Sequence, residues 1–305
     1  MTKMKNLKIS FIIATVDRDE DLQRCVTSIE KAHEYKKDIS IETFIVIQKA
    51  KEKKNIQVLY QDLINFYYIE ELGLSGARNF AIEKSTGEYL VFLDDDAAVN
   101  VDFLEVLAKR ISEYSEVNAF CGKLLDYDQS TPFSVLFHGD KVKSLNRWDY
   151  QYFMGSAHVL SRKVLEKIGY YDKQFGVGSD YYRGGEETDV FFRLKAGNEK
   201  VLYLPDLVFL HPITLPSYSY AYNYGHAIGA VMTKHCINDK LNFYIYVVII
   251  LKLTSRMAIR LLQKVIFKGA YVKMNERYHY GAWLRGIFRG IKDFIRKEVT
   301  IKRTG

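Results

Sequence analysis

The sequence of 305 residues predicts an α/β fold, in which a mainly parallel sheet is flanked by helices and followed by a C-terminal helical appendage. Short apolar segments typical of buried parallel strands alternate with segments of helical periodicity in the N-terminal third of the chain. This alternation favours a sheet covered on both faces. A hydrophobic fraction of 48% also supplies enough apolar side chains for a sizeable core.

Each predicted element has its own signature. The strands are short apolar runs, and we expect them at 8–16, 41–48, 66–69 and 89–93. Helical spacing predicts helices from Asp19, from Ser75 as the N-cap to about Lys84, and over 102–114. The later pattern is less regular. It predicts a β segment at 119–121, a helix at 161–168, a helix opening at 184–189, and two short strands at 201–204 and 207–210.

The charge of the chain is unevenly distributed. The net charge is +7, but the segment from Cys236 to the end holds 15 Lys and Arg against 4 Asp and Glu, a balance of +11. The remainder is mildly acidic, at −4. From this shift we expect an α/β domain at 1–215 and a basic amphipathic helical region at 216–305.

The cysteines and the N-terminal segment bear on the cellular compartment. The 3 cysteines are far apart and odd in number, which fits a reducing compartment better than a disulfide framework. The apolar stretch that ends before Asp17 is too short for a signal peptide. We therefore expect a cytoplasmic protein.

Three consecutive carboxylates, Asp94, Asp95 and Asp96, directly follow the predicted strand at 89–93. Ligands of parallel α/β sheets bind at the carboxyl ends of the strands. Adjacent carboxylates repel one another, and no Lys or Arg within several residues relieves them, whereas a divalent cation such as Mg²⁺ or Mn²⁺ would. A solvated acidic turn is the alternative. The position at the end of a buried strand favours the metal site.

A second acidic cluster, Glu186, Glu187 and Asp189, follows Gly184 and Gly185. The helix dipole stabilises acidic residues at a helix start, which by itself accounts for carboxylates there. The two glycines additionally let the backbone approach another group closely. A carboxylate placed opposite a reacting carbon can deprotonate an attacking hydroxyl. A metal at one cluster and a base at the other make a coherent pair.

Five short motifs occur in a fixed order along the chain. They are ATVDR at 14–18, GLSGARN at 73–79, TGEYLVFLDDD at 86–96, GSA at 155–157 with VLEKIGYYD at 164–172, and GGEETDVFFRL at 184–194. In this order they resemble family-2 glycosyltransferases of the GT-A (Rossmann-like) fold, over roughly two thirds of the chain. The resemblance implies a metal-dependent, inverting transfer of a sugar from a nucleoside-diphosphate sugar, normally a UDP-sugar, to an acceptor hydroxyl. Bacterial surface-polysaccharide biosynthesis is the implied setting, and 1–215 the catalytic domain.

The resemblance assigns roles to the first acidic cluster. Asp94 and Asp96 match the two ends of the family's Asp-x-Asp (DXD) motif, and Asp95 occupies its variable middle position. Asp96 is thereby implied as the metal ligand, with Mn²⁺ or Mg²⁺ as the cofactor, and Asp94 as a contact to the ribose or the sugar. In relatives with a histidine at the position of His211, it can complete the metal site, although a histidine before a proline can also be structural.

The donor nucleotide is implied to bind at Thr15 and Asp17, after the first strand, and near Arg78. For Arg78 the alternative is a position on the helix surface. The family usually has an aspartate after its second strand, whereas this chain has Gln48, whose amide can still hydrogen-bond a pyrimidine edge. This departure leaves the identity of the base open.

The family's Glu-Asp motif matches Glu186 and Glu187, so Glu187 is the expected general base, with Asp189 as its rival. The segment Gly155–Ala157 is implied to lie between the donor and acceptor sites, which includes Ser156. The nearby Trp148 can stack on the apolar face of a sugar, or it can pack in the core.

The basic tail predicts amphipathic helices. Its cationic residues recur four apart at Lys252, Arg256, Arg260, Lys264 and Lys268. A later stripe combines Trp283, Leu284, Ile287, Phe288, Ile291, Phe294 and Ile295 with arginines and lysines on the other side. Such helices suit an anionic membrane surface, or they pack on the catalytic domain. We favour a peripheral position on the inner face of the cell membrane, with a saccharide or lipid-linked acceptor and no nucleic-acid partner.

Two other functions remain to be weighed. A sugar-nucleotide pyrophosphorylase also uses a nucleotide-binding α/β sheet, but it needs a glycine-rich phosphate loop after the first strand, and residues 14–18 contain no glycine. A non-catalytic, membrane-associated scaffold of transferase ancestry has no need of both acidic clusters. The sequence therefore favours the glycosyltransferase.

Overall fold

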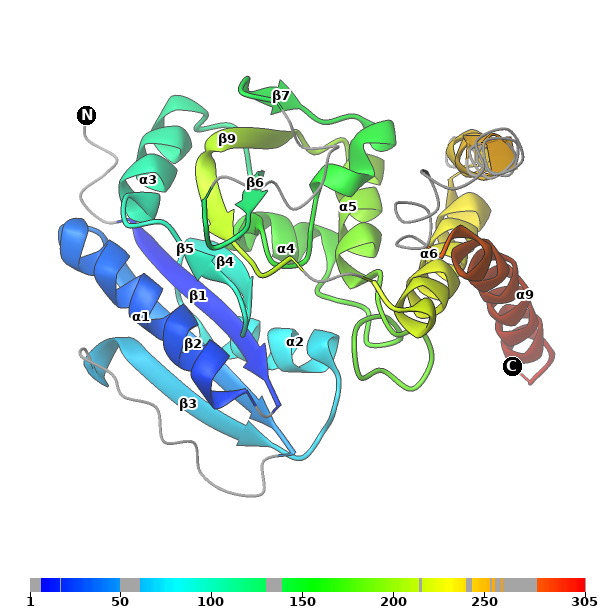
Figure 1. The fold of residues 1–305 in the computed structure, drawn as a ribbon, viewed down its shortest axis with the longest axis horizontal. Coiled ribbons are helices and arrows are strands. Elements are labelled where there is room, and N and C mark those ends of the chain that lie inside the picture. Colours follow the sequence, from blue (N-terminus) through cyan, green and yellow to red (C-terminus); the bar gives the residue numbers. More distant parts are fainter. Residues whose placement is uncertain are drawn as a thin grey trace, which may run out of the picture. The chain divides into compact units, whose positions relative to one another are not determined.

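The structure, a computed structural model, describes residues 7–16, 18–49, 61–129, 139–213, 216–239, 243–252, 254–255, 259 and 279–304. The chain divides into two compact units (Figure 1). The first comprises Met1–Lys173 and Val190–Ile213, and the second comprises Gln174–Asp189 and Thr214–Gly305.

The first unit is built on one mixed sheet, in the order β3-β2-β1-β4-β8-β6-β9-β5, with β7 also paired to β9. The strands are β1 (Lys8–Thr15), β2 (Ser40–Gln48), β3 (Ile64–Ile69), β4 (Tyr89–Asp94), β5 (Ala98–Val99), β6 (Ala119–Leu125), β7 (Lys143–Ser144), β8 (His158–Ser161) and β9 (Val201–Leu210). The four strands from β3 to β4 are parallel to one another, and β6 and β9 are parallel to each other. The sheet confirms the predicted α/β class.

Helices flank this sheet. They are α1 (Asp19–Tyr35), α2 (Leu74–Lys84), α3 (Phe103–Glu113), α4 (Arg162–Ile168) and α5 (Glu186–Ala196), whose first turn belongs to the second unit. The connection through α1 leads from β1 to β2, whereas the connection through α2 leads back from β3 to β4. Right-handed crossovers in opposite directions place α1 and α2 on opposite faces, and Figure 1 shows α1 crossing in front of the strands.

The core of the first unit lies between the sheet and the helices α1 and α3. Phe11, Phe103 and Phe209 are almost completely buried there, and their rings form a continuous row with centroid separations of 6.1 and 5.0 Å. Burying each such ring stabilises the fold by about 2–3 kcal/mol. The packed rings thereby fix β1 and β9, which contain Phe11 and Phe209.

Two predicted details are wrong. Ser75 is buried inside the first turn of α2, and Gly73 occupies the N-cap instead with a φ of 142°. Glycine is favoured there because a Cβ would be strained at this φ, and the Gly73 N–H donates to Oε1 of Gln48 at 2.7 Å. The two strands expected at 201–204 and 207–210 are one strand, β9. The sequence analysis also missed β8, which is only four residues long.

A bulge explains why β9 looks like two strands. Its register with β6 shifts between Gly122 and Lys123, which pair with Leu204 and Val208, so Pro205 to Leu207 are extra residues. A Cβ on Gly122 would lie 2.1 Å from the Leu207 carbonyl oxygen, so only glycine fits beside the bulge. On the other side, Arg110 of α3 holds Asp206 through a salt bridge of 2.6 Å.

The second unit contains the long helices α6 (Tyr218–Asn238) and α9 (Tyr280–Thr304), together with a helical segment at 243–252. Glycines let α6 and α9 approach at backbone contact. A Cβ on Gly225 would lie 2.1 Å from the Trp283 carbonyl oxygen, and one on Gly229 would lie 2.2 Å from that of Ile287. Because both partners advance by four residues, the two helices run parallel.

In the described part of the chain, none of the helices combines the length and apolar character needed to cross a bilayer.

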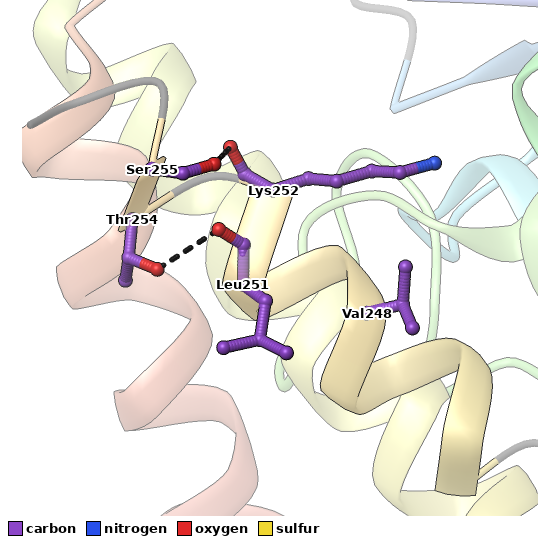
Figure 2. A pocket seen from close by; sticks show the side chains of 5 residues that line it. All are labelled: Val248, Leu251, Lys252, Thr254 and Ser255. Atoms are coloured by element: carbon purple, nitrogen blue, oxygen red, sulfur yellow. Dashed lines mark hydrogen bonds between the residues drawn. The ribbon is translucent and has the colours of Figure 1, made fainter. Parts of the chain in front are cut away.

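A shallow, open hollow lies on the helical segment at 243–252 and the residues that follow it (Figure 2). Its lining consists of Val248, Leu251, Lys252, Thr254 and Ser255. The hydroxyls of Thr254 and Ser255 donate to the backbone carbonyls of Leu251 and Lys252 at 3.0 Å. Both hydroxyls of this surface therefore bond to backbone carbonyls three residues earlier in the chain.

Candidate active site

Asp94 is the last residue of β4, and Asp95 and Asp96 form the turn that follows it. The turn is closed by a hydrogen bond from the Ala97 amide to the Asp94 carbonyl at 3.1 Å. The short strand β5 comes next and pairs antiparallel with the end of β9, with Ala98 opposite Leu210. This pairing brings the residue after β9, which is His211, to the aspartate turn.

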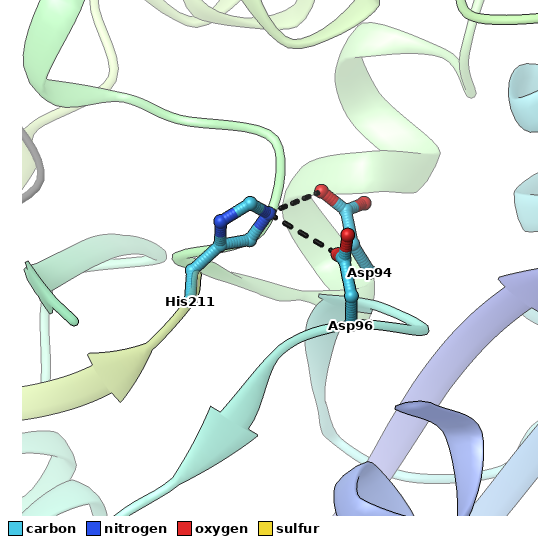
Figure 3. Close-up of side chains that lie close together, drawn as sticks. All are labelled: Asp94, Asp96 and His211. Carbon is cyan, nitrogen blue, oxygen red and sulfur yellow. Dashed lines mark ion pairs between the residues drawn. The ribbon is translucent and has the colours of Figure 1, made fainter. Parts of the chain in front are cut away.

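His211 faces two of the three carboxylates (Figure 3). Its Nε2 lies 3.2 Å from Oδ1 of Asp96 and 4.0 Å from Oδ2 of Asp94. Its Nδ1 lies 2.9 Å from the Pro212 carbonyl, which can only accept, so Nδ1 is the donor. This bond fixes the ring with Nε2 toward the carboxylates. Ligand atoms of Asp94, Asp96 and His211 all lie within 4.8 Å of one another.

Asp96 and His211 influence each other's protonation. Burial opposes the ionisation of Asp96, but the imidazole of His211 and the charge of Arg18 outweigh it and hold the pKa of Asp96 below its ordinary value. Burial also favours the neutral imidazole of His211, yet the Asp96 hydrogen bond and the charges of Asp94 and Asp96 raise its pKa. The carboxylates therefore favour the protonated form of His211, as expected of a cluster that attracts a cation.

Two arginines distant in sequence form salt bridges with the carboxylates. The guanidinium of Arg78 is completely buried and donates from Nη2 to Oδ1 of Asp94 at 3.0 Å and to the Gly155 carbonyl at 2.8 Å. Arg18, whose side chain is 53% exposed, donates to Oδ2 of Asp96 at 2.6 Å and to Oδ1 of Asp95 at 3.2 Å. The helix-surface alternative for Arg78 is thus wrong, because the residue lies beneath the cluster.

Asp95 is bound by other residues than His211, namely Thr15 and Arg18. It is buried and accepts a hydrogen bond of 2.6 Å from the hydroxyl of Thr15, at the end of β1. Burial is the largest influence on its carboxyl group and raises its pKa to about 6, against the opposing effects of Thr15 and Arg18. Asp95 therefore ties the aspartate turn to β1 rather than facing Asp94 and Asp96.

The expected nucleotide residues lie at one edge of the sheet. Thr15 and Gln48 end the adjacent parallel strands β1 and β2, beside Asp94 at the end of β4, and ligands of α/β sheets bind at this edge. Gln48 is buried, and its amide oxygen already accepts the Gly73 N–H. Asp17 lies outside the described residues.

The second acidic cluster opens α5 and belongs to the second unit. Glu186 and Glu187 are 4% and 8% exposed, and Glu187 accepts a hydrogen bond from the Thr188 hydroxyl at 3.2 Å. Gly184 and Gly185 both have positive φ, and a Cβ on Gly185 would lie 3.2 Å from Val231 of α6. The sequence predicted that these glycines let the backbone approach another group closely, and that group is α6.

Asp189 is completely buried and is occupied by two partners on α6. Its Oδ1 accepts from Nζ of Lys234 at 2.7 Å and lies 2.9 Å from Nε2 of His235. These contacts attach the first turn of α5 to α6. They suit a structural carboxylate better than one that exchanges protons with a substrate.

Of the expected acceptor residues, Gly155 is linked to the aspartates through Arg78, and the neighbouring Ser156 is buried. Trp148 lies on a separate 3-10 helix, Arg147–Tyr152, and is 48% exposed. Its ring is therefore available for contact with a ligand and does not pack in the core.

Two residues of the site, Arg18 and Tyr127, were not predicted from the sequence. Arg18 belongs to the first motif and follows β1, at the same sheet edge as Asp94. This position was the signal that could have assigned Arg18 to the site. Tyr127, whose hydroxyl donates to the Asp96 carbonyl at 2.5 Å, follows β6 and carried no such signal.

Comparison with known proteins identifies the family. Residues 10–169 match the family described as "Glycosyl transferase family 2". An uncharacterised protein of Haemophilus influenzae is 29% identical over 184 residues, which cover 55% of this chain and 94% of that one. Glycosyltransferase GlyA of Streptococcus pneumoniae is 25% identical over 234 residues, which cover 70% of this chain but only 31% of the relative.

Solved structures share the fold at low sequence identity. A mannosyltransferase from Pyrobaculum calidifontis, in complex with GDP-Man and Mn²⁺, aligns with a TM-score of 0.64 at 14% identity over 94% of this chain and 88% of its own. TarS residues 1–349 of S. aureus, in complex with UDP, aligns with a TM-score of 0.60 at 13% identity over 98% and 92%. These likenesses establish the GT-A fold. Because the family match covers just over half of the chain, from β1 into the residue after α4, the protein belongs to glycosyl transferase family 2.

Proposed function

We propose that this protein transfers a sugar from a nucleoside-diphosphate sugar to a hydroxyl of a saccharide or lipid-linked acceptor, with inversion at the anomeric carbon. The observation that carries the proposal is the meeting of Asp94, Asp96 and His211 at the carboxyl edge of the sheet, beside the ends of β1 and β2. Cell-surface polysaccharide synthesis at the inner face of the membrane is the setting we propose, with 1–215 as the catalytic domain.

The named relatives support the class of donor. The Pyrobaculum enzyme was solved with GDP-Man and TarS with UDP, and the pneumococcal relative is named a glycosyltransferase. We assign a UDP-sugar to this chain because Gln48 and Thr15 offer neutral hydrogen-bonding groups at the ends of adjacent strands. The donor sugar is to be found by the screen described below.

The residues of the cluster fit a divalent cation. Two carboxylates and an imidazole form the donor set, and the outer nitrogen of His211 is fixed by a carbonyl, as in most histidine metal ligands. We propose that Asp96 and His211 hold Mn²⁺ or Mg²⁺, with Asp94 turned to the ion or to the donor sugar. Mn²⁺ accepts imidazole more readily than Mg²⁺, which prefers oxygen. A bound ion would supply positive charge next to the leaving diphosphate.

The base is assigned to Glu187. One of its carboxylate oxygens would take the proton of the acceptor hydroxyl while that oxygen forms a bond to the anomeric carbon and the bond to the diphosphate breaks. Glu186 would orient this segment, and Asp189 would hold it on α6 through Lys234 and His235. The exposed Trp148 and the Gly155–Ser156 segment are proposed acceptor contacts.

A screen of sugar nucleotides tests the function. Purified full-length protein is incubated with UDP- and GDP-sugars and Mn²⁺, and thermal stability and nucleoside-diphosphate release are measured. We expect one donor to raise the melting temperature, since a ligand that binds only the folded state stabilises it. Release of the diphosphate should stop on addition of EDTA and resume with excess Mn²⁺. Turnover that is insensitive to EDTA would exclude the metal assignment.

Variants of the second acidic cluster test the base. Glu187→Gln should reduce turnover by at least 100-fold while leaving the thermal shift with donor intact, because it removes a proton acceptor but no donor contact. Asp189→Asn serves as the comparison and should mainly lower stability. If Asp189→Asn abolishes turnover in a stable protein and Glu187→Gln does not, the two roles are reversed.

A further inference from the structure

The side chains of α9 divide into three stripes along the helix. One stripe is buried against α6: Cβ atoms on Gly286 and Gly290 would lie 2.2 and 2.0 Å from the carbonyl oxygens of Tyr222 and His226. Ala282, Ile287 and Phe294 share this buried side. The sequence pattern counted Ile287 and Phe294 with the membrane-facing residues, but the packing on α6 buries both side chains, whereas Trp283 is half-buried.

A second, apolar stripe remains on the surface of α9. It consists of Leu284, Phe288, Ile291 and Ile295, which recur at intervals of four, three and four residues and so lie on one side of the helix. Phe288 is 53% exposed and Ile295 is 45% exposed, whereas Leu284 and Ile291 are half-buried. Phe288 and Ile295 therefore present apolar side chains to the surface of the helix.

A third stripe is cationic and lies directly beside the apolar one. Its members, Arg285, Arg289, Lys292 and Arg296, each follow an apolar-stripe residue by one position, about 100° around the helix. All four side chains are exposed. Arg289 also forms a salt bridge with Asp293 on the same helix. The exposed surface of α9 therefore combines a row of hydrocarbon with a row of cations.

We propose that these two stripes are a docking surface for an anionic phospholipid bilayer, with Phe288 and Ile295 entering the boundary of the acyl chains and the four cations lying on the lipid phosphates. The proposal deepens the proposed function by naming the surface that would bring the enzyme to a lipid-linked acceptor, but it depends on α9 alone. Amphipathic helices with Lys and Arg on the polar side and large apolar residues on the other bind membranes in this orientation.

The chemistry of the surface favours lipid over other partners. A nucleic acid would engage the cations but leave the apolar stripe in water. A second copy of α9 would cover the apolar stripe but would bring two cationic stripes close together. An anionic bilayer satisfies both stripes at once, because it offers phosphate charge above a hydrocarbon interior.

Sedimentation with lipid vesicles tests the proposal on the full-length protein. We expect binding to vesicles of phosphatidylcholine with about one third phosphatidylserine, weaker binding as salt is raised, and little binding to phosphatidylcholine alone. The double variant Lys292→Gln/Arg296→Gln should lower the affinity for anionic vesicles by about 10- to 30-fold. Phe288→Ser/Ile295→Ser should lower it to a similar extent without altering the charge.

A matched control removes the same charge elsewhere. Lys31 and Lys109 are exposed on α1 and α3, and Lys31→Gln/Lys109→Gln should leave vesicle binding unchanged. Equal losses in this control and in Lys292→Gln/Arg296→Gln would overturn the proposal, because net charge alone would then account for binding. So would binding to an RNA or DNA oligomer in preference to vesicles, or dimerisation that is lost in Phe288→Ser/Ile295→Ser.

Transfer to a soluble acceptor is measured without vesicles in the same variants. It should be unchanged in all three, since none of the substituted residues belongs to the proposed active site. Vesicle binding without any transfer would refute the proposed function and leave the docking surface standing, and transfer without vesicle binding would do the reverse.

Discussion

The carboxylate of Asp94 has neighbours of two kinds. Arg78 binds one of its oxygens from beneath at 3.0 Å, and Nε2 of His211 lies 4.0 Å from the other. The guanidinium of Arg78 is completely buried, and its Nη2 donates to both Asp94 and the Gly155 carbonyl, so one nitrogen connects the two. We propose that Arg78 is a positioning residue, which sets the direction in which Asp94 presents its remaining oxygen.

Arg78→Lys tests this role. A lysine keeps the positive charge, but its shorter side chain does not reach as far as Nη2, and it lacks the planar group that lies over the Tyr171 ring at 5.4 Å. We expect the free energy of unfolding to fall by about 1–3 kcal/mol, from the loss of a hydrogen bond to a charged group. The affinity for Mn²⁺, measured by calorimetry, should fall as well. Loss of stability with unchanged Mn²⁺ affinity would make Arg78 a packing residue only.

His158 lies next to Arg78 in the same buried layer. It is completely buried, and its ring nitrogens lie 2.6 Å from the Tyr171 hydroxyl and 2.7 Å from the Met154 carbonyl. Burial, helped by the charge of Arg78, lowers the pKa of His158 to about 3. The folded protein therefore keeps this imidazole neutral throughout the physiological range.

This pKa predicts a loss of stability in mild acid. Between about pH 6.5 and pH 3 the unfolded chain holds a proton on His158 that the folded protein does not, so the free energy of unfolding falls as the pH falls through this window. From pH 7 to pH 5 the contribution amounts to about 1–2 kcal/mol. Urea unfolding at both pH values should show this loss in the native protein and a correspondingly smaller one in His158→Gln. Equal losses in the two would argue against the prediction.

At the scale of the element, the bulge of β9 sets the position of His211. The extra residues Pro205 to Leu207 let the strand change its register on β6 and still pair with β5 up to Leu210. The amide of His211 then donates to the Leu125 carbonyl at 2.9 Å. His211, the proposed metal ligand, appears isolated in the sequence but is thus positioned by a strand that pairs with β6 and β5.

Gly122→Ala should disturb the position of His211. The new Cβ would lie 2.1 Å from a backbone oxygen of the bulge, so the strands must separate. We expect a loss of about 2 kcal/mol or more in the free energy of unfolding, as for other overpacked sites, together with weaker Mn²⁺ binding. Gly139→Ala is the matched control, since its Cβ would meet nothing nearer than a ring atom of Tyr203 at 3.9 Å. Equal effects of the two changes would contradict the role given to the bulge.

The α6–α9 pair offers a similar comparison within one helix. Gly290→Ala would place a Cβ 2.0 Å from the His226 carbonyl oxygen and should force the helices apart. Gly281→Ala would meet only the end of the Arg285 side chain at 3.8 Å, and it should be neutral or stabilise the helix by up to about 1 kcal/mol. Thermal unfolding of both variants measures the difference. Similar melting temperatures would mean that the helices pack more loosely than the backbone contacts indicate.

At the scale of the whole molecule, the sequence predicted those features that depend on local pattern. The parallel strands β1, β2 and β4 follow from short apolar runs, and the place of Asp94 and Asp96 follows from the rule that strand ends bind ligands. His211 was reached only through the order of motifs, because its approach to Asp96 requires the pairing of β5 with β9.

The remaining features depend on contacts between distant residues. Arg18 and Arg78 meet the aspartates across 77 and 16 positions of sequence, and no local pattern reports such a pairing. The absence of Lys or Arg near the aspartates in sequence was therefore misleading, since the fold supplies two arginines. The bulge of β9 was hidden for the same reason: Pro205 and Asp206 interrupt an apolar pattern, and only Gly122 on another strand makes room for them.

The parallel course of α6 and α9 constrains the chain that joins them. Trp283 lies beside Gly225, so the connection that leaves Asn238 must travel back along α6 for roughly 20 to 25 Å before α9 can begin. About eight residues of extended chain suffice for that distance, whereas 41 residues lie between Asn238 and Tyr280. A tight hairpin can never join these helices, but most of the connection exceeds what reach requires.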